Sequence, residues 1–568
     1  MANNPNANIP AASAPTWQNW SGNLVHKPAS DGGKYYFAPT NLTELKSVLT
    51  EVSKVRGAII RVSGQRHSQP PLVAEDNRAA IPQTTKTYLV DMSCYADLGP
   101  AHDKHVVLGP GKNQVTVNTG VREDELDAFL TQHNLMLKTV TAGGFFSLGG
   151  MTAVDVHGAT VDAPIFAETV SAFNILLADG TVTTIDGKSS AVAGWSPLQF
   201  ARVALGGLGI VTSITIDVLE RPWATTLQGG TERLGLADKP AFVEKFKTLL
   251  GEHTRVETFF TPYATGFLWL GVKNFLALFW DVIKDPSSKT PNASPNPPPN
   301  ACILARKQPP EYGAPYLTGI AQFGAEFAVQ SQYFDSPIAG AAEITAVATF
   351  ETIEPEVATA NKSHSDLWLT GAVRVIFMSY FVPLPGLDDE GLGKAWDGLD
   401  VVSKIVTQND NFHIAAPMEF RFVKGGNSVM SGAFTEDPEQ TWFVNLDLIG
   451  FVEAEQMASD YPAKLLQFFA DVERKWVEMG GLPHNGKMYG FYDPTEAPGT
   501  YSKTGPFNQN FLAGLRKLRG ARLEAFNAYR KSLDPNGLFY NEFLRNLLEF
   551  VERRAPRTKA SGRLPPQQ

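Results

Sequence analysis

The chain has 568 residues, which is too long for a single simple core, so two large domains are expected. Apolar residues make up 43% and charged residues 19%, a composition that excludes a disordered chain. The formal net charge is −9 and the Lys and Arg residues are scattered, which argues against nucleic acid as a partner.

Neither a membrane span nor a cysteine framework is predicted. Cys94 and Cys302 are too far apart to indicate a disulfide framework or a zinc site. No uncharged apolar run reaches the roughly 18 residues of a transmembrane helix. Residues 1–15 lack the basic and apolar regions of a secretory signal. We expect residues 1–34 to be a flexible leader, and the protein to be a mature secreted or periplasmic form from which a signal has been removed; a cytoplasmic location is the alternative.

The first third of the chain mixes helices and strands. A helix is predicted after Asn41, because apolar residues recur at helical spacing up to residue 55. A tight turn at residues 178–180 predicts a hairpin of strands 170–177 and 181–185. Four other strands are predicted at residues 58–62, 87–91, 105–108 and 115–119, and a second helix is predicted at residues 123–133.

Three Gly-rich stretches interrupt this region. The first, Arg61–Ser68, ends a strand, and the second and third cover residues 142–158 and 205–212. Glycine permits close backbone approach, and successive turn N–H groups can bind an anion. Any one stretch alone would more often be an ordinary turn. Three of them, separated by helices and strands, indicate that the backbone approaches a ligand.

These stretches resemble the FAD-binding domain of the vanillyl-alcohol oxidase/p-cresol methylhydroxylase superfamily. The matching motifs are Arg61-x-x-Gly64-x-x-His67-Ser68, Gly149-Gly150 with His157-Gly158, and Gly206–Thr212. The resemblance implies that the first loop cradles the FAD pyrophosphate and that His67 is bonded covalently to the C8 methyl of the flavin. Non-covalent or bicovalent binding is the alternative. A Rossmann domain is not expected, because no Gly-x-Gly-x-x-Gly follows an early strand.

The resemblance also implies an α+β fold of two domains, an FAD-binding domain and a substrate (cap) domain with a mixed or antiparallel sheet and flanking helices. The FAD-binding domain is expected at residues 35–222, the cap domain at 223–500, and a segment that returns to the FAD domain at 501–568. The residues expected to contact FAD are Arg61, Ser63, Gly64, Gln65, Arg66, His67, Ser68, Gly144, Ser147, Gly149, Gly150, His157, Gly158, Gly209, Ile210, Val211 and Asn541.

An aromatic run at residues 266–283 is interpreted as a helix with one narrow polar stripe. It is either a buried helix of the cap domain or a lid that faces a membrane surface or lines an apolar cavity. Other elements expected in the second half are strands at 372–381 and 442–449 and helices at 392–407 and 510–533.

Three polar groups in the second half are candidates for chemistry. Glu419 and Arg421 share one face of a strand, as a structural ion pair or as a charge-stabilising pair near the flavin. Lys487 follows a Gly-containing turn; it is either a surface residue or a desolvated base with a lowered pKa. Asn445 is an amide in an apolar strand, either a core polar group or a substrate contact, and Asp447 shares its face.

This order of motifs resembles two groups of flavin-dependent alcohol oxidases, the flavin-histidine cholesterol oxidases and the sugar-alcohol and aldonolactone oxidases. It implies catalytic roles for Glu419, Arg421, Lys487 and Asn445. Pro-His-x-Gly-Lys around His484 is more similar to the sugar-type group, whereas Asn445 and the aromatic middle are more similar to the cholesterol oxidases. The active-site glutamate of the latter is not evident from the sequence around residues 381–385.

We therefore expect an FAD-dependent alcohol oxidase that converts a 3β-hydroxysteroid such as cholesterol to the ketone, with isomerisation to the 4-en-3-one, and reduces O2 to H2O2. Lys487, or Glu419 through a water, would take the hydroxyl proton. The alternatives are a polyol or aldonolactone oxidase and a dehydrogenase with another electron acceptor. The expected partners are a small apolar alcohol and O2, with transient membrane-surface contact through residues 266–283; the oligomeric state is left open.

Overall fold

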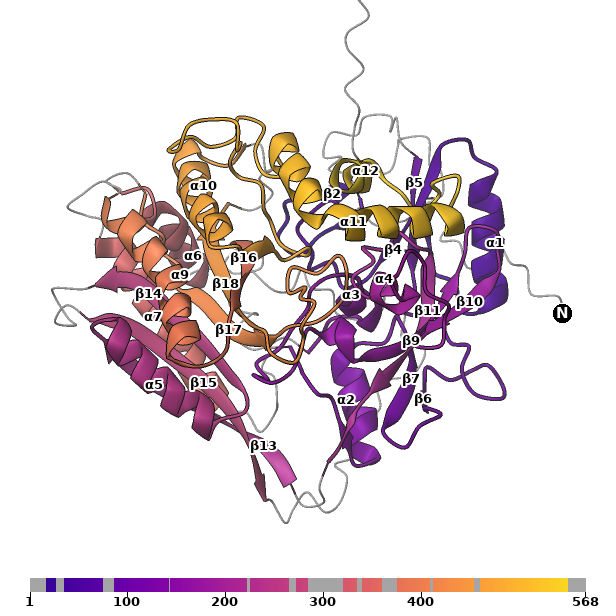
Figure 1. The fold of residues 1–568 in the computed structure, drawn as a ribbon, viewed down its shortest axis with the longest axis horizontal. Coiled ribbons are helices and arrows are strands. Elements are labelled where there is room, and N and C mark those ends of the chain that lie inside the picture. Colours follow the sequence, from indigo (N-terminus) through magenta and orange to yellow (C-terminus); the bar gives the residue numbers. More distant parts are fainter. Residues whose placement is uncertain are drawn as a thin grey trace, which may run out of the picture.

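Two α+β regions lie side by side in the protein, whose structure is a computed structural model (Figure 1). The expected α+β fold is confirmed. Within the described ranges, no helix has the length and apolar character needed to cross a bilayer. The structure describes residues 17–26, 35–74, 86–141, 144–221, 225–264, 272–284, 320–334, 340–359, 375–408, 412–453 and 460–549.

A small parallel sheet ends at the first Gly-rich stretch. Its strands pair in the order β3 (Tyr36–Phe37), β5 (Lys86–Asp91) and β4 (Ala58–Ser63). Helix α1 (Leu42–Ser53) buries its apolar face against this sheet, and Asn41 caps the helix by accepting a hydrogen bond from Glu44 N. The predicted helix and strands are confirmed here.

An antiparallel sheet carries the third Gly-rich stretch. Its order is β10 (Val182–Asp186), β9 (Val170–Leu176), β11 (Ile210–Asp217), β7 (Gln114–Asn118) and β6 (Val106–Leu108). The predicted hairpin is the β9–β10 pair, and α3 begins directly after Ser147 in the second stretch. The other elements are α2 (Glu123–Gln132), β8 (Leu135–Met136), α3 (Leu148–Ala153), η1 (Phe166–Thr169), α4 (Pro197–Ala201) and β12 (Leu219–Glu220).

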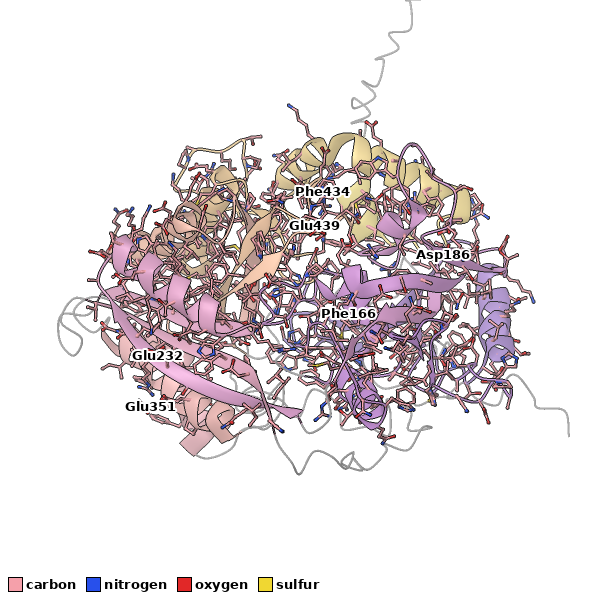
Figure 2. The ribbon with its side chains drawn as sticks, turned by 60° about the horizontal axis from the view of Figure 1, so that its bottom comes forward. Phe166, Asp186, Glu232, Glu351, Phe434 and Glu439 are labelled. Carbon is pink, nitrogen blue, oxygen red and sulfur yellow. The ribbon has the colours of Figure 1, made fainter. Side chains whose placement is uncertain are left out.

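The second region is built on a seven-stranded antiparallel sheet. Its order is β13 (Thr225–Leu236), β15 (Lys273–Lys284), β14 (Val256–Ala264), β17 (Met418–Lys424), β18 (Trp442–Phe451), β16 (Val375–Leu384) and β19 (Leu482–Pro483). The helices are α5 (Lys239–Glu252), α6 (Ile320–Ser331), α7 (Gly340–Thr359), α9 (Asp389–Gln408) and α10 (Ala463–Glu478). Figure 2 shows Glu232 of β13 and Glu351 of α7 at the outer end of this region, whereas Phe166 lies where the two regions meet.

The helix expected at 266–283 is wrong, because residues 273–284 form strand β15 in the interior of the sheet. Alternate residues of the strand pack on opposite faces: Phe275 against α5 and α9, and Leu276 against α7. Both faces are therefore apolar, so the period of two that identifies a half-buried strand is lost. The first residues of the run, 266–271, lie outside the described residues.

Part of the expected leader is also wrong, because residues 17–26 form a buried hairpin of β1 (Trp17–Gln18) and β2 (Val25–His26). Trp17 Nε1 donates a hydrogen bond to Ser63 Oγ at 2.9 Å, and the Trp20 ring lies 4.8 Å from the His67 ring, centre to centre. Cys94 is disulfide-bonded, which the spacing of the cysteines did not predict.

The C-terminal helices α11 (Gln509–Leu533) and α12 (Glu542–Leu548) lie along the first region (Figure 1). The Tyr529 ring of α11 stacks on Phe200 of α4 with 5.2 Å between ring centres, and Ile60 N of β4 donates to Leu538 O. Helix α11 changes direction at Gly520, which has a φ of 49°.

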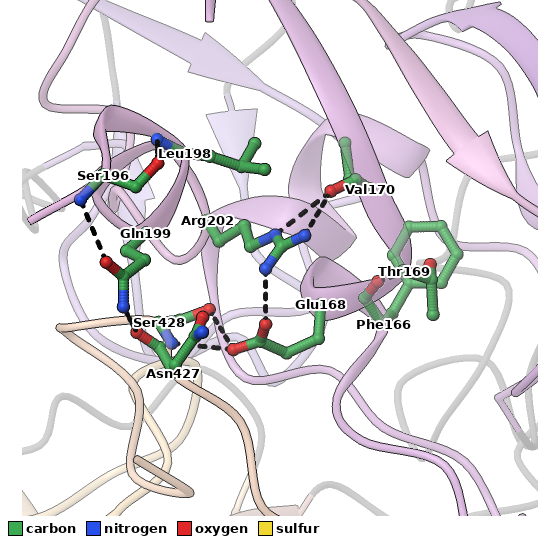
Figure 3. A network of polar contacts seen from close by, with 10 residues as sticks. All are labelled: Phe166, Glu168, Thr169, Val170, Ser196, Leu198, Gln199, Arg202, Asn427 and Ser428. Atoms are coloured by element: carbon green, nitrogen blue, oxygen red, sulfur yellow. Dashed lines mark hydrogen bonds and ion pairs between the residues drawn. The ribbon is translucent and has the colours of Figure 1, made fainter. Parts of the chain in front are cut away.

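A polar contact joins the two regions beside η1 (Figure 3). Glu168 pairs with Arg202 at 2.7 Å and accepts a hydrogen bond from Ser428 N, also at 2.7 Å. Gln199 Nε2 donates to Asn427 O at 3.1 Å. The loop that follows β17 is thus held on the first region by a buried carboxylate and an amide.

Candidate functional site

Arg61 links three segments of the first region. Its guanidinium donates four hydrogen bonds to backbone carbonyls: Nε to Leu72 O, Nη1 to Gly206 O and Phe539 O, and Nη2 to Leu205 O, at 2.5–2.9 Å. Burial lowers the pKa of Arg61 to about 10. The side chain therefore fastens the first Gly-rich loop to the third loop and to the C-terminal segment.

Gly64 is required by a close approach between the first and second loops. A Cβ atom at this position would lie 2.2 Å from Ser147 Oγ, well inside van der Waals contact. Gly206 in the third loop has a φ of 68°, in the left-handed region that favours glycine. The three Gly-rich stretches, separated by up to 145 residues, thus meet at close range.

One pocket is lined by all three loops and continues to the seven-stranded sheet. From the first loop it includes residues 61–68, from the second Ser147, Gly149, Gly150, residues 151–154, Val156 and His157, and from the third Gly206 and Gly209. The lining residues on the cap side are Phe377, Glu419, Arg421, Asp447, His484, Gly486 and Lys487.

In the second, or cap, region, charged residues gather on one face of the seven-stranded sheet. Antiparallel pairing sets Arg421 of β17 between Glu257 of β14 and Asn445 of β18, and Glu419 opposite Asp447. Directly paired residues point to the same face of a sheet, so these five side chains share one surface. Arg421 Nη2 lies 3.0 Å from Glu257 Oε1 and also contacts Glu419 Oε1.

The buried carboxylates titrate near neutral pH. Burial raises the pKa of Glu419 to about 7; the Arg421 charge opposes the rise and the Glu257 charge reinforces it. Burial, reinforced by Glu419, raises the pKa of Asp447 to about 6. Burial lowers the pKa of Arg421, but Glu257 and Glu419 outweigh that effect and the net shift is upward.

Lys487 reaches this cluster from the turn after β19. Its Nζ lies 3.3 Å from His67 Nε2 and 3.7 Å from the centre of the Phe377 ring. Burial lowers the pKa of Lys487, although the charges of Asp447 and Glu419 oppose the shift. An amine with a lowered pKa is neutral over a wider range of pH and can accept a proton. The structure therefore brings Glu419, Arg421, Asp447 and Lys487 together, as the sequence indicated.

The comparisons with known proteins agree with this arrangement. A family model described as an FAD binding domain matches residues 34–186, and one described as D-arabinono-1,4-lactone oxidase matches residues 351–547. The chain belongs to the vanillyl-alcohol oxidase/p-cresol methylhydroxylase superfamily. It is accordingly an FAD-dependent oxidoreductase.

Relatives of this flavoprotein extend over nearly its whole length. L-gulonolactone oxidase of Bos taurus is 21% identical over 528 residues, covering 93% of this chain and 97% of that protein. L-gulono-1,4-lactone dehydrogenase of Mycobacterium tuberculosis is 21% identical over 537 residues, covering 94% and 99%. The match to L-gulonolactone oxidase of Mus musculus, 24% identical over 274 residues, covers 45% of this chain and 56% of that protein.

Solved structures of cholesterol oxidases have the same fold. A solvent-stable cholesterol oxidase has a TM-score of 0.67 at 16% identity, covering 96% of this chain and 99% of that one. A cholesterol oxidase from B. sterolicum has a TM-score of 0.66 at 15% identity, covering 96% and 100%. At such low identity the similarity concerns the fold and not the substrate.

The pocket of this flavoprotein fits FAD. Gly64 leaves no space for a side chain between the first two loops, which is the close backbone approach that a pyrophosphate cradle needs. His67 Nδ1 is buried and has no hydrogen-bond partner among the described residues. Burial, with the Lys487 charge adding to it, lowers the pKa of His67 well below its usual range, so the imidazole is neutral.

Five residues expected at the site do not line the pocket among the described residues: Gly144, Gly158, Ile210, Asn445 and Asn541. Asn445 Nδ2 donates to Ser379 Oγ at 2.9 Å, on the same face of the sheet as the charged cluster. Asn541 Nδ2 donates to Pro71 O at 2.9 Å and so supports the first loop from behind. A Cβ at Gly158 would lie 2.0 Å from Val140 O, so that glycine serves backbone packing.

Sequence reasoning missed Glu257. Residues 381–385 contain no glutamate that could serve the site. The structure instead places Glu257 of β14 against Arg421, which follows it by more than 160 residues in the chain. Glu257 is 2% exposed, in a strand that reads Val-Glu-Thr-Phe-Phe. A lone acidic residue in an apolar strand was the available signal, because a charge is rarely buried without a partner.

Proposed function

We propose that the protein oxidises a hydroxyl group of an aldonolactone, with FAD as the electron acceptor. The observation that carries this proposal is the charged character of the cap side of the pocket. Among the seven described cap residues that line it, only Phe377 is apolar, while Glu419, Arg421 and Asp447 are ionisable and buried and Lys487 is ionisable and half-buried. Relatives that match over more than nine-tenths of their length are named as gulonolactone oxidase and dehydrogenase.

A sterol would leave this cluster unpaired. Arg421 Nε and Asp447 Oδ1 are buried and have no hydrogen-bond partner among the described residues. Each such group that stays unpaired against hydrocarbon costs about 1–3 kcal/mol, whereas the hydroxyl and carbonyl oxygens of a sugar lactone can pair with it. Binding sites that hold hydrogen-bonding groups reject ligands that cannot satisfy them. The cholesterol expected from the sequence is supported only by the likeness of fold.

Each residue of the charged cluster has its own role in the proposed reaction. Bound FAD, held by the three Gly-rich loops, would supply the two-electron acceptor for oxidation of the carbon bearing the hydroxyl. Lys487 Nζ takes the hydroxyl proton, as its lowered pKa permits. Arg421 stabilises negative charge that develops on the substrate oxygen, and Glu257 and Glu419 hold the guanidinium in place.

We also propose that His67 holds the FAD covalently. Its neutral imidazole lies on the pocket, Nε2 faces Lys487, and Nδ1 is without a partner among the described residues. Acid precipitation should leave the yellow colour on the protein, and His67→Ala should release it into the supernatant. The exposed His133 provides a control, since His133→Ala should keep the colour in the pellet. Colour that washes out of the unaltered protein would show non-covalent binding.

The substrate is tested by anaerobic bleaching of the flavin, which does not depend on the acceptor. L-gulono-1,4-lactone or D-arabinono-1,4-lactone should bleach the enzyme, and detergent-dispersed cholesterol should not. Bleaching by cholesterol with none by the lactones would refute the proposal. Adding O2 or a redox dye to the reduced enzyme then distinguishes an oxidase, which releases H2O2, from a dehydrogenase, which reduces only the dye.

A further inference from the structure

The turn that carries Lys487 is held by the FAD-binding region and not by the cap sheet alone. We call residues 484–487 the Lys487 turn. His484 N donates to Ser379 O and Met488 N donates to Phe377 O, so strand β16 of the cap sheet supports the chain at both ends of the turn. The middle of the turn is also bonded to the first region: Asn485 N donates to Asp155, and Gly486 O accepts a hydrogen bond from Gln69 N.

Asp155 makes the larger of these contacts. It follows α3, only two residues before His157, and is completely buried. Its Oδ2 accepts hydrogen bonds from Asn485 N at 2.8 Å and Asn485 Nδ2 at 2.6 Å, and its Oδ1 accepts one from Gly432 N at 2.9 Å. One carboxylate thus binds two separate segments of the cap region.

Burial is the largest effect on Asp155 and raises its pKa above the ordinary value, whereas the N–H donors around the carboxylate oppose that rise and favour the ionised form. Asn485 is oriented from its other side: Nδ2 also donates to Met430 O, and Oδ1 accepts from Arg519 Nη2 at 3.1 Å. Neither Asn485 nor its neighbours in the turn can shift without breaking a bond that is sealed from water.

Gln69 makes a second contact with the turn, two residues after His67. Gln69 N donates to Gly486 O at 3.1 Å. Its side-chain amide binds the start of β16, donating to Val375 O at 3.0 Å and accepting from Phe377 N at 2.9 Å. Gln69 is completely buried. The first Gly-rich loop and the Lys487 turn therefore move together.

We propose that Asp155 is a positioning residue for Lys487: by fixing Asn485, it places the amine relative to the FAD-binding loops instead of relative to the cap sheet. The inference rests on the proposed function in taking Lys487 as the base. Its physical reason is that proton transfer tolerates little misplacement, and a displacement of about 1 Å costs up to about 100-fold in rate. A base fixed to the cofactor region keeps its place when the two regions shift.

The test compares Asp155→Asn with a matched control, Asp493→Asn. In the first variant an amide N–H must face either Asn485 N–H or Gly432 N–H, so one donor loses its acceptor. Asp493 is a nearly buried carboxylate that accepts hydrogen bonds from Thr495, Asn508 and Asn510, and it does not contact the Lys487 turn. Both changes remove a charge and weaken local hydrogen bonds, so loss of thermal stability does not distinguish them.

The distinguishing measurement is the pH dependence of Lys487 acylation by acetic anhydride in the holoenzyme, followed by peptide mapping. Water that enters a loosened turn should raise the Lys487 pKa toward its ordinary value in Asp155→Asn, and leave it unchanged in Asp493→Asn. The groups facing the amine, Glu419, Arg421, Asp447, His67 and His484, are the same in both. The rate of flavin reduction should fall about 10- to 100-fold in Asp155→Asn at unchanged flavin content and with little change in KM.

Identical acylation profiles in the two variants would overturn the proposal and leave Asp155 a merely structural residue. If Asp155→Asn does not fold, Asn485→Ala replaces it: this change removes the side-chain bonds but keeps the Asn485 N–H, so the Lys487 pKa should rise by less, and an unaltered pKa would refute the proposal. Because acylation is measured without substrate, the result holds even if no aldonolactone is oxidised, which would count against the proposed function alone.

Discussion

Replacing Glu257 with Gln should lower the pKa of Glu419. Glutamine keeps the size of Glu257 and an oxygen that can accept from Arg421 Nη2, 3.0 Å away, but it removes one of the two negative charges that face the guanidinium. The pKa of Glu419 stands at about 7 against an ordinary 4.5, because of burial first and the Glu257 charge in addition. Removing that charge therefore makes ionised Glu419 easier to form.

The size of the shift follows from Coulomb's law. Two unit charges about 4 Å apart at an effective dielectric constant near 20 repel by about 4 kcal/mol, the equivalent of roughly three pKa units. Burial accounts for the larger part of the rise and is unchanged by the substitution, so we expect the Glu419 pKa to fall by about 1–2 units. Asp447, which faces Glu419 directly, is influenced mainly by burial and should move less.

The shift can be measured by infrared titration of the protonated carboxyl band in the resting enzyme, with Glu419→Gln identifying the band that belongs to Glu419. Glu232→Gln is the matched control, because Glu232 is a partly exposed residue of β13 that pairs with Lys245 far from the pocket. A Glu419 band that stays in place, or moves to higher pH, in Glu257→Gln would refute the electrostatic account of the cluster.

Three further changes test other parts of the site. Lys487→Met should slow flavin reduction by a lactone about 100- to 10,000-fold while the flavin stays bound. It should also remove the rise of kcat/KM with pH that deprotonation of a base produces, and a variant with unaltered kinetics would exclude Lys487 as the base. Gly64→Ala should reduce the flavin content of the purified protein, because the new Cβ lies 2.2 Å from Ser147 Oγ and forces the Ser147 side chain into another rotamer at a cost of about 1 kcal/mol. Adding Ser147→Ala removes that oxygen, leaves only a contact of 3.5 Å between the two Cβ atoms, and should restore the flavin content. Arg61→Met leaves four carbonyls without their donor and should lower the free energy of unfolding by about 3–5 kcal/mol in urea titration; Arg233→Met, at a one-third exposed surface ion pair, should cost about 1 kcal/mol or less, and equal losses would contradict the role of Arg61.

Short-range patterns predicted much of the FAD-binding region. The apolar spacing of α1, the β9–β10 hairpin and the three Gly-rich stretches depend on neighbouring residues, and each appears where it was expected. Glu419 and Arg421 could be placed on one face from the alternation of a strand, and both face the pocket. The lowered pKa expected for Lys487 follows from its burial beside Arg421.

Contacts between residues far apart in the chain explain the structural predictions that were wrong. Strand β15 looked like a helix because helices cover both of its faces, and residues 17–26 looked like a leader because Ser63 and His67, their partners, lie some 45 residues away. The hydrogen bond from Asn445 Nδ2 to Ser379 Oγ on the neighbouring strand likewise depends on strand pairing that local sequence does not give. In each case the missing information was the identity of a partner far along the chain.

The sequence by itself determined the chemistry that this protein can hold: three loops suited to FAD, a histidine beside them, and a Glu-x-Arg pair with a later lysine. Only the tertiary structure decided how those groups combine. Strand register sets Glu257 against Arg421, and the bonds of Asp155 and Gln69 bring the Lys487 turn to the FAD-binding loops. The physical reason is that a residue's burial, charge partners and pKa depend on neighbours that local sequence does not name, and here those neighbours gather buried charged groups on one side of the pocket.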